Sequence, residues 1–372
     1  MQNFIVSARK YRPATFDSVV GQSHITTTLK NAIRSGQLAQ AFLFCGPRGV
    51  GKTTCARILA KTINCTNPTA DMEACGECES CRSFDGGQSM NIFELDAASN
   101  NSVDDIRTLV EQVRIPPQTG RYKVYIIDEV HMLSTAAFNA FLKTLEEPPA
   151  YAKFILATTE KHKIIPTILS RCQVFDFKRI ETRDIVKHLE YVAQNEGVSY
   201  EPEAIQIIAL KAEGGLRDAL STFDQLVSFT GGNLTKQRCL ENLNLLDSDY
   251  YFRFVDMFRA GDVAGALTLY QEIIDKGFDG QHFITGLTEH VRNLIVAIDP
   301  ATQNLLDVSD NDRQHYARQS QECGLALLMR YLDTASDYEY RFRDAGNKRL
   351  FVEVALMKLA AVVKNLQVQA AG

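Results

Sequence analysis

Gly46-Pro47-Arg48-Gly49-Val50-Gly51-Lys52-Thr53 is the stretch that decides the fold. An apolar run over residues 41–44 precedes it and is typical of a strand, and a helical pattern over residues 52–63 follows it. In this context the glycines let successive backbone N–H groups converge on a polyphosphate at the helix N-terminus, where the helix dipole favours an anion. The alternative is a glycine-rich turn that fits by chance, and the flanking strand and helix disfavour it. The predicted nucleotide-binding residues are Gly46, Pro47, Arg48, Gly49, Val50, Gly51, Lys52, Thr53 and Thr54.

A second motif, Val124-Tyr125-Ile126-Ile127-Asp128-Glu129, ends an apolar strand in two carboxylates. We expect Lys52 to reach the β- and γ-phosphates of ATP, and the Thr53 hydroxyl to bind Mg²⁺ together with Asp128. Glu129 is then the base, or the group that orients the attacking water. Acidic residues are also common in the first turns of helices, so this motif is strong only in combination with the nucleotide-binding loop. We interpret His131 as structural.

The pattern around these motifs predicts an α/β domain with a parallel sheet over residues 1–180. Segments such as Tyr125-Ile126-Ile127 and Phe154-Ile155-Leu156 are continuously apolar, as strands buried on both faces should be. The expected strands are residues 41–44, 92–96, 123–127, 154–158 and 174–177, and the expected helices are residues 25–35, 52–63, 103–113 and 135–145. After residue 180 the strands stop. Residues 181–243 are interpreted as a small helical domain, with helices over 183–196, 202–212 and 216–229, and residues 244–372 as a second helical domain that ends in an apolar helix over 348–366.

Four of the nine cysteines lie in one short stretch, with the spacing C-x9-C-x2-C-x2-C. Four thiolates suit tetrahedral structural zinc, which leaves no open coordination position for metal chemistry. A four-cysteine iron–sulfur cluster is the remaining rival, and free thiols at this density are disfavoured. The predicted zinc ligands are Cys65, Cys75, Cys78 and Cys81, and the other five cysteines are interpreted as small buried hydrophobes.

Composition excludes several function classes. The chain has 372 residues and a net charge of −5, so bulk electrostatics would not hold nucleic acid, and any DNA contact must come from a local patch or from one face of an assembly. No apolar run is long enough to cross a bilayer, and the first residues do not resemble a signal peptide. We therefore expect a cytoplasmic protein with no membrane partner.

Further motifs carry a family resemblance. The segment Ala8-Arg9-Lys10-Tyr11-Arg12-Pro13-Ala14-Thr15-Phe16, followed by Val19-Val20-Gly21-Gln22, resembles the N-terminus of clamp-loader ATPases of the AAA+ class. The inserted cysteines, with Ile127-Asp128-Glu129-Val130-His131-Met132-Leu133 and Leu142-Lys143-Thr144-Leu145-Glu146-Glu147-Pro148-Pro149, resemble the gamma/tau family of bacterial DNA polymerase III. The family's longer form continues beyond a domain like residues 244–372, so the chain resembles the short form or a truncated piece of the long one.

The resemblance implies further roles. Thr159 matches the polar sensor of the γ-phosphate, with Thr158 as the less favoured choice, and Arg171 in Ser170-Arg171-Cys172 matches an arginine finger that acts in trans on the ATP of a neighbouring subunit. Arg217 matches the second sensor, through which a helical lid responds to the nucleotide. The implied fold is an α/β AAA+ P-loop ATPase domain with a zinc-binding insertion over residues 65–81 (1–180), a helical lid domain (181–243) and an all-α oligomerisation collar (244–372).

The implied function is that of an ATP-driven motor that loads a ring-shaped sliding clamp onto primed DNA within a bacterial DNA polymerase III. The implied cofactors are ATP, Mg²⁺ and Zn²⁺. The implied partners are delta and delta-prime type subunits, copies of the chain itself, the sliding clamp (beta) and primer-template DNA. Two alternatives stay open: another AAA+ DNA motor, such as a branch-migration helicase or an initiator, and a non-hydrolysing scaffold like the delta-prime subunit.

Overall fold

The computed structural model describes residues 5–117, 120–306 and 308–371. The chain divides into two compact units, one made of residues 1–199 and 208–233, the other of residues 200–207 and 234–372. The expected limits at residues 180 and 243 stay a prediction. Each unit is described by itself.

The first unit is built on a five-stranded parallel sheet, as the sequence predicts. The strand order is β2-β3-β4-β1-β5, so the central strand β4 lies between β1 and β3. The five expected strands are all present, with ends shifted by at most two residues. Their bounds are β1 (Ala41–Cys45), β2 (Ile92–Asp96), β3 (Lys123–Asp128), β4 (Ala152–Thr158) and β5 (Gln173–Asp176).

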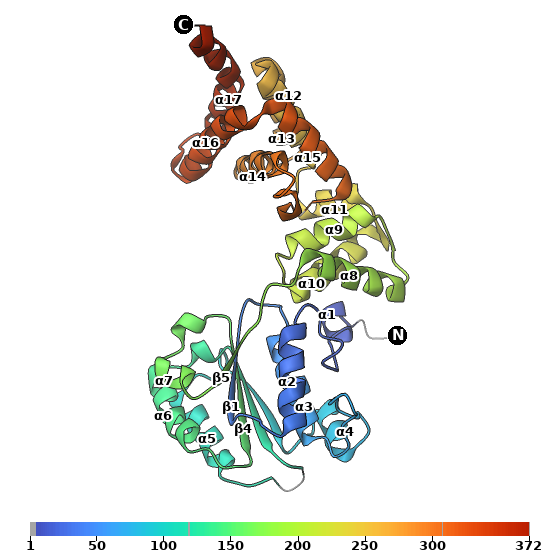
Figure 1. Cartoon of the computed structure of the whole chain (residues 1–372), viewed down its shortest axis with the longest axis vertical. Coiled ribbons are helices and arrows are strands. Elements are labelled where there is room, and N and C mark those ends of the chain that lie inside the picture. Colours follow the sequence, from blue (N-terminus) through green and yellow to red (C-terminus); the bar gives the residue numbers. More distant parts are fainter. Residues whose placement is uncertain (1–4, 118–119, 307, 372) are drawn as a thin grey trace. The chain divides into compact units, whose positions relative to one another are not determined.

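Helices cover both faces of this sheet (Figure 1). Side chains of α2 and α3 pack on one face, against strand residues such as Phe42, Phe44 and Ile126. Side chains of α5 and α6 pack on the other, against Leu43 and Tyr125. This two-sided burial accounts for the apolar runs of the inner strands β1, β3 and β4, whereas the edge strands β2 and β5 are partly exposed. The helices of this part are α1 (Ser7–Lys10), α2 (Ser23–Ser35), α3 (Lys52–Asn64), α4 (Glu79–Asp85), α5 (Val103–Val113), α6 (Thr135–Glu146) and α7 (Pro166–Leu169), with short 3-10 turns at Val130–Met132 and Lys161–Lys163.

The C-terminal end of α3 is attached to the beginning of β3. Asn64, the last residue of α3, donates from its amide nitrogen to the Tyr122 carbonyl across 2.9 Å and accepts from the Tyr122 N–H across 2.9 Å. The Asn64 side chain is buried, and this reciprocal pair satisfies both of its polar ends. The helix that begins at the nucleotide-binding loop is thereby fixed to the strand that ends at Asp128.

The first unit continues into helices α8 (Thr182–Glu196) and α10 (Leu216–Thr230), which pack against each other. The expectation that strands stop after residue 180 is wrong in one detail. Two-residue strands β6 (Ser199–Tyr200) and β7 (Asn233–Leu234) form a small second sheet. Two residues are too few to leave a periodic pattern, so the sequence gives no sign of them. Helix α9 (Pro202–Lys211) lies between these strands in the chain.

The second unit has a helical core with α14 at its centre, packed against α12, α15, α16 and α17. Its helices are α11 (Lys236–Leu243), α12 (Ser248–Ala260), α13 (Val263–Asp275), α14 (Gly280–Ile298), α15 (Asp310–Cys323), α16 (Leu325–Arg341) and α17 (Lys348–Ala371), with 3-10 turns at Gln303–Leu305 and Phe342–Asp344. Helix α17 packs against α12, α13, α14 and α16, which explains why it is apolar over much of its circumference.

His290 of α14 is buried in this core. Its Nδ1 forms a hydrogen bond with the Tyr316 hydroxyl across 2.8 Å, and the ring of Phe252 meets it edge to face. None of the helices in the described part of the chain has the length and apolar character that a membrane crossing requires.

Candidate nucleotide site and cysteine cluster

The nucleotide-binding loop depends on glycine at two places. Gly46 has φ 147°, and a Cβ there would lie 2.4 Å from the Phe177 carbonyl oxygen, so only glycine allows this close approach. Gly51, with φ 102°, turns the chain into α3, whose first residue is Lys52. The loop therefore presents its backbone at a helix N-terminus, the arrangement expected for a phosphate site.

Lys52 is buried and lies back across this loop. Its Nζ donates to the carbonyls of Gly46 and Pro47, across 2.8 and 2.7 Å. Burial lowers the pKa of Lys52, and the carboxylates of Glu129 and Asp128 partly offset that effect. A buried ammonium held only by backbone carbonyls and two nearby carboxylates is a suitable partner for a bound anion.

The two predicted magnesium ligands are in direct contact. The Thr53 hydroxyl, in the first turn of α3, donates to Asp128 Oδ2 across 2.6 Å, although 75 residues separate them in the chain. Asp128 is the last residue of β3, so the parallel sheet delivers it to the same edge as the loop that follows β1. A hydroxyl and a carboxylate oxygen are the ligand types that Mg²⁺ takes beside phosphate oxygens.

Glu129 adopts the left-handed backbone conformation, with φ 47° and ψ 44°. A non-glycine residue in this region carries backbone strain. The Thr159 hydroxyl, at the end of β4, donates to Glu129 Oε2 across 3.1 Å. The structure therefore brings Thr159, the favoured sensor candidate, into contact with the predicted base.

Thr158 has different partners. Its fully buried hydroxyl accepts the Glu160 N–H across 3.0 Å and lies 3.0 Å from His131 Nδ1. His131 also lies between two carboxylates, with Nδ1 3.5 Å from Glu129 Oε2 and Nε2 3.1 Å from Glu160 Oε2. The sequence interpretation gave His131 no place at the site. Only its position two residues after Glu129 could have indicated one.

Arg217 reaches the loop through its backbone. Its N–H donates to the Gly49 carbonyl across 3.4 Å, and a Cβ on Gly49 would lie 3.4 Å from Arg217 Cβ. Gly215, just before α10, is equally close: a Cβ there would lie 3.3 Å from the Arg48 carbonyl oxygen. The N-terminus of α10 therefore sits directly on the nucleotide-binding loop.

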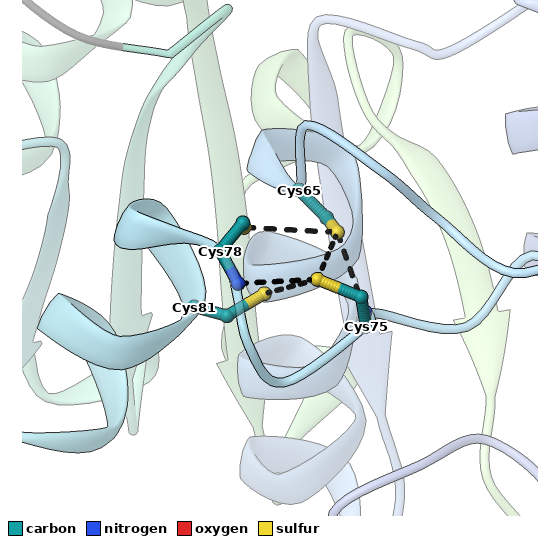
Figure 2. Close-up of side chains that lie close together, drawn as sticks. All are labelled: Cys65, Cys75, Cys78 and Cys81. Carbon is teal, nitrogen blue, oxygen red and sulfur yellow. Dashed lines mark hydrogen bonds between the residues drawn. The ribbon is translucent and has the colours of Figure 1, made fainter.

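The four cysteines of the predicted zinc site form one cluster (Figure 2). Their sulfur atoms all lie within 4.8 Å of one another, and the hydrogen-bonded pairs are separated by 3.5 to 4.0 Å. Zn–S bonds of about 2.3 Å in a tetrahedron place sulfur atoms about 3.8 Å apart. The cluster thus has the size that one tetrahedral metal ion needs. Cys65 follows α3, Cys78 caps α4 and Cys81 lies within α4, and no disulfide joins any cysteine in the part of the chain that is described.

Three family models match successive parts of the chain. The model for DNA polymerase III, delta subunit, matches residues 21–181, and that for the DNA polymerase III clamp loader subunit, ATPase lid domain, matches residues 184–232. The model for DNA polymerase III subunits gamma and tau, domain III, matches residues 234–370. Among curated proteins, the DNA polymerase III subunit gamma of Buchnera aphidicola is 33% identical over 359 residues, which cover 96% of this chain and 97% of that protein. The chain belongs to the DNA polymerase III gamma/tau family.

Other gamma/tau relatives are longer. The tau subunit of Bacillus subtilis is 40% identical over 94% of this chain, and that of Escherichia coli is 42% identical over 80%. This chain spans 62% and 46% of their lengths, respectively. Among solved structures, the Thermotoga maritima RuvB branch-migration motor aligns with 66% of this chain and 78% of its own at 19% identity and a TM-score of 0.47, a similarity too low to carry an argument.

Arg171, the predicted finger of this gamma/tau chain, is held away from the loop. Its Nη2 donates to Glu146 Oε1 across 2.8 Å, and its Nη1 donates to the Thr167 carbonyl across 2.7 Å. Within the described residues, no hydrogen bond or ion pair joins Arg171 to Lys52, Asp128 or Arg217.

Arg12 is a residue of the gamma/tau site that sequence reasoning missed. Its Nε donates to the Thr54 hydroxyl in α3 across 3.2 Å. Burial, then the charge of Arg57, lowers the pKa of Arg12, and the carboxylates of Glu94 and Asp128 partly offset this. Arg12 therefore lies beside the nucleotide-binding loop among charges of both signs, and only its place in the family's N-terminal motif could have indicated it.

The surroundings of the four thiols shift their pKa values in different directions. Burial raises the pKa of Cys65 and of Cys81. Backbone N–H groups of Cys78 and Glu77 lower the pKa of Cys75. Burial opposes ionisation of Cys78, but hydrogen bonds from the backbones of Thr66 and Cys81 outweigh it and lower its pKa to about 6. Backbone donors already favour two thiolates, and a bound cation would supply the charge that favours the other two.

Proposed function

We propose that the chain is an ATP-hydrolysing motor subunit of a bacterial DNA polymerase III clamp loader, which uses ATP to load a sliding clamp onto primed DNA. One observation carries the proposal: Lys52, the Thr53–Asp128 pair and the Glu129–Thr159 pair lie at one edge of one sheet, with the backbone of Arg217 attached to the same loop. Membership of the gamma/tau family supplies the class of partner.

Residues 46–54 would hold the triphosphate. Loop N–H groups would bind phosphate oxygens, and Lys52 Nζ would exchange its two carbonyl partners for the β- and γ-phosphates. Thr53 and Asp128 would hold Mg²⁺, which when bound neutralises charge on the phosphates. Both ligand oxygens are already adjacent, so little rearrangement is needed.

Glu129 would orient the attacking water and accept its proton. Its strained backbone and the hydrogen bond from Thr159 fix the direction of the carboxylate. Thr159 would sense the γ-phosphate by exchanging that hydrogen bond, and the buried Thr158 hydroxyl is already engaged with His131 and the Glu160 N–H. This difference in partners favours Thr159 over Thr158.

Two arginines would complete the site. Arg217 would bring its guanidinium to the nucleotide of its own subunit, because its backbone already contacts Gly49. Arg171, paired with Glu146, would act on the nucleotide of a neighbouring subunit. A guanidinium at either place stabilises charge that builds up on the transferred phosphoryl group.

The cysteine cluster would hold one structural zinc ion through Cys65, Cys75, Cys78 and Cys81. Sulfur atoms within 4.8 Å of one another suit a single ion. An iron–sulfur cluster would need room for several irons and sulfides between the thiolates, so the geometry favours zinc.

The proposed assembly contains copies of this chain, delta and delta-prime type subunits, the beta sliding clamp and primer-template DNA, in the bacterial cytoplasm. Residues 1–180, 181–243 and 244–372 would form the ATPase, lid and collar domains. Truncation near residue 243 should preserve the fold of the remainder and abolish stable assembly, which mass measurement in solution would detect. Assembly by the truncated chain would place the main interface elsewhere.

ATP hydrolysis, measured with and without clamp and primed DNA, tests the proposal. We expect turnover that clamp and primed DNA stimulate, and we expect Lys52→Ala to abolish it. In a branch-migration motor, DNA alone would stimulate ATP hydrolysis without the clamp. A delta-prime-like scaffold would not hydrolyse ATP in either condition.

A further inference from the structure

Glu73 is a buried acidic residue of the cysteine loop (residues 65–81), two positions before Cys75. Its carboxylate leaves the loop and accepts the backbone N–H of Phe16 across 2.9 Å and that of Asp17 across 3.1 Å. Lys30 of α2 completes the contact, with Nζ 2.8 Å from Glu73 Oε1 and 2.6 Å from Asp17 Oδ1. One side chain of the cysteine loop therefore binds two backbone donors more than fifty residues earlier in the chain and the ammonium group of Lys30.

The cysteine loop is folded so that it presents this carboxylate. Thr69 N–H donates to the Glu73 carbonyl across 2.9 Å, and Glu73 N–H donates to the Thr69 hydroxyl across 3.1 Å. Met72 adopts a left-handed conformation with φ 58°. A tight turn with a strained non-glycine residue persists only where its surroundings hold it, and this turn lies between Cys65 and Cys75 of the four-cysteine cluster.

The segment that Glu73 holds also lies on the nucleotide-binding loop. Upstream of Phe16, Arg12 donates to Thr54 across 3.2 Å. Downstream, Val19 Cγ1 lies 3.9 Å from the position a Cβ on Gly51 would occupy, and Gln22 Nε2 lies 3.5 Å from the Val50 carbonyl. Glu73 thus binds residues 16–17, and the residues on either side of them in the chain contact residues 50–54.

We propose that Glu73 is a positioning residue through which the metal-bound cysteine loop holds residues 12–22 against the nucleotide-binding loop, so that metal occupancy sets nucleotide affinity. This inference rests on the proposed nucleotide and zinc sites and adds a link between them. The cluster orders the loop, the loop fixes Glu73, and Glu73 fixes the backbone that carries Arg12. The buried acceptor makes the link strong, since loss of its carboxylate leaves two backbone donors without their acceptor and leaves Lys30 with Asp17 alone.

The test combines two changes, Glu73→Ala and removal of zinc, each made alone and both made together in the full-length chain. Zinc is removed with a chelator, and the protein is then dialysed into buffer with Mg²⁺. The probe is a fluorescent ATP analogue. Asp71→Ala is the matched control, because Asp71 is an exposed carboxylate in the same loop. Zinc content, circular dichroism and amide hydrogen exchange at Phe16 and Asp17 are measured on every sample.

We expect Glu73→Ala to keep one zinc per chain and to weaken binding of the analogue about tenfold, as the loss of one buried charged hydrogen-bonding group implies. Zinc removal should weaken binding in the wild type and in Asp71→Ala, but should have little further effect in Glu73→Ala. Exchange at Phe16 and Asp17 should rise in both the variant and the zinc-free wild type.

Equal affinity for the analogue in Glu73→Ala and wild type would overturn the inference and leave the proposed function standing. The same holds if zinc removal weakens binding of the analogue equally in Glu73→Ala and in wild type. A wild type that binds no analogue would overturn the proposed nucleotide site as well. If circular dichroism shows that Glu73→Ala does not fold, Glu73→Gln replaces it. Its neutral amide should weaken binding about threefold, because it loses the ion pair with Lys30, and wild-type affinity in that variant would contradict the link.

Discussion

The Thr53 hydroxyl and an Asp128 carboxylate oxygen lie 2.6 Å apart, at the beginning of α3 and the end of β3. The contact joins the two motifs from which the sequence predicts a magnesium site. The two residues are 75 positions apart in the chain, so it is the packing of α3 beside β3 that brings these oxygens together.

Thr53→Val should weaken Mg²⁺-dependent ATP binding by at least tenfold, because valine keeps the shape and removes the hydroxyl ligand. Titration of nucleotide at a series of Mg²⁺ concentrations measures this loss. Thr53→Ser, which retains the hydroxyl, should stay close to wild type. If the serine variant loses as much affinity as the valine variant, the hydroxyl is not the ligand.

Glu129→Gln should retain ATP binding and a clamp-binding state while turnover falls by about 10² or more, since the amide cannot accept a proton from water. Hydrolysis rates at saturating ATP, together with clamp pull-down, separate the two effects. Wild-type turnover in this variant would assign the base elsewhere, and Glu160→Gln, which alters a carboxylate paired with His131 and Lys163, serves as the neighbouring control.

Arg171→Ala should leave the nucleotide affinity of the isolated subunit nearly unchanged and reduce DNA-stimulated turnover of the assembly by roughly 10³ or more. Mixing these subunits with Lys52→Ala subunits, which keep the finger, should partly restore hydrolysis. Mixed assemblies that form without any recovery would contradict a shared finger. Glu146→Gln, which removes the charge that pairs with Arg171 and leaves the Thr167 carbonyl as a partner, should leave turnover intact or raise it.

Purified protein should contain one zinc per chain, and removal of the metal should destabilise the cysteine loop, because thiolate ligation couples metal binding to folding. Elemental analysis and hydrogen exchange over residues 65–81 measure both. Cys65→Ser should lose zinc, whereas Cys239→Ser, at a buried cysteine outside the cluster, should keep it. Iron in place of zinc would favour the rival cluster.

The second unit should lose stability as pH falls below about 6.5. Burial lowers the pKa of His290 from 6.5 to about 3, so in this range the unfolded chain gains a proton that the folded chain refuses. The expected loss is about 1.4 kcal/mol per pH unit, or about 2 kcal/mol at pH 5. Amide-exchange protection of α14 measures it. His290→Phe should reduce this loss of stability with falling pH, whereas His282→Gln, at an exposed histidine, should not. If the loss is unchanged in His290→Phe, other titratable groups cause it.

Most of the fold was predictable because its signals are repetitive. The inner strands β1, β3 and β4 are buried on both faces and give continuous apolar runs, and the helices between the strands repeat their apolar residues every three or four positions. The two-residue strands β6 and β7 were not predictable, since pairing of so few residues leaves no pattern.

The site was predictable only where a motif places residues side by side in the chain. Lys52 and Asp128 fall in such motifs. The approach of Arg12 to Thr54, that of His131 to Thr158 and the grip of Glu73 on Phe16 join residues 27 to 57 positions apart. A single arginine, histidine or glutamate has no periodicity, so only the folded chain reveals these pairs. The choice between Thr158 and Thr159 likewise needed their hydroxyl partners.

The attachment of Asn64 to Tyr122 has a mechanical consequence. Helix α3 and strand β3 form two sides of a closed frame, pinned at one corner by Thr53 and Asp128 and at the far corner by Asn64 and Tyr122. The 13 residues of α3 make that side about 20 Å long. In a frame with two fixed corners, neither side can slide along the other, so the spacing of the Thr53 and Asp128 oxygens, the proposed magnesium ligands, is maintained partly from the opposite end of the domain. Loosening of the remote corner would be transmitted along the helix as a shear.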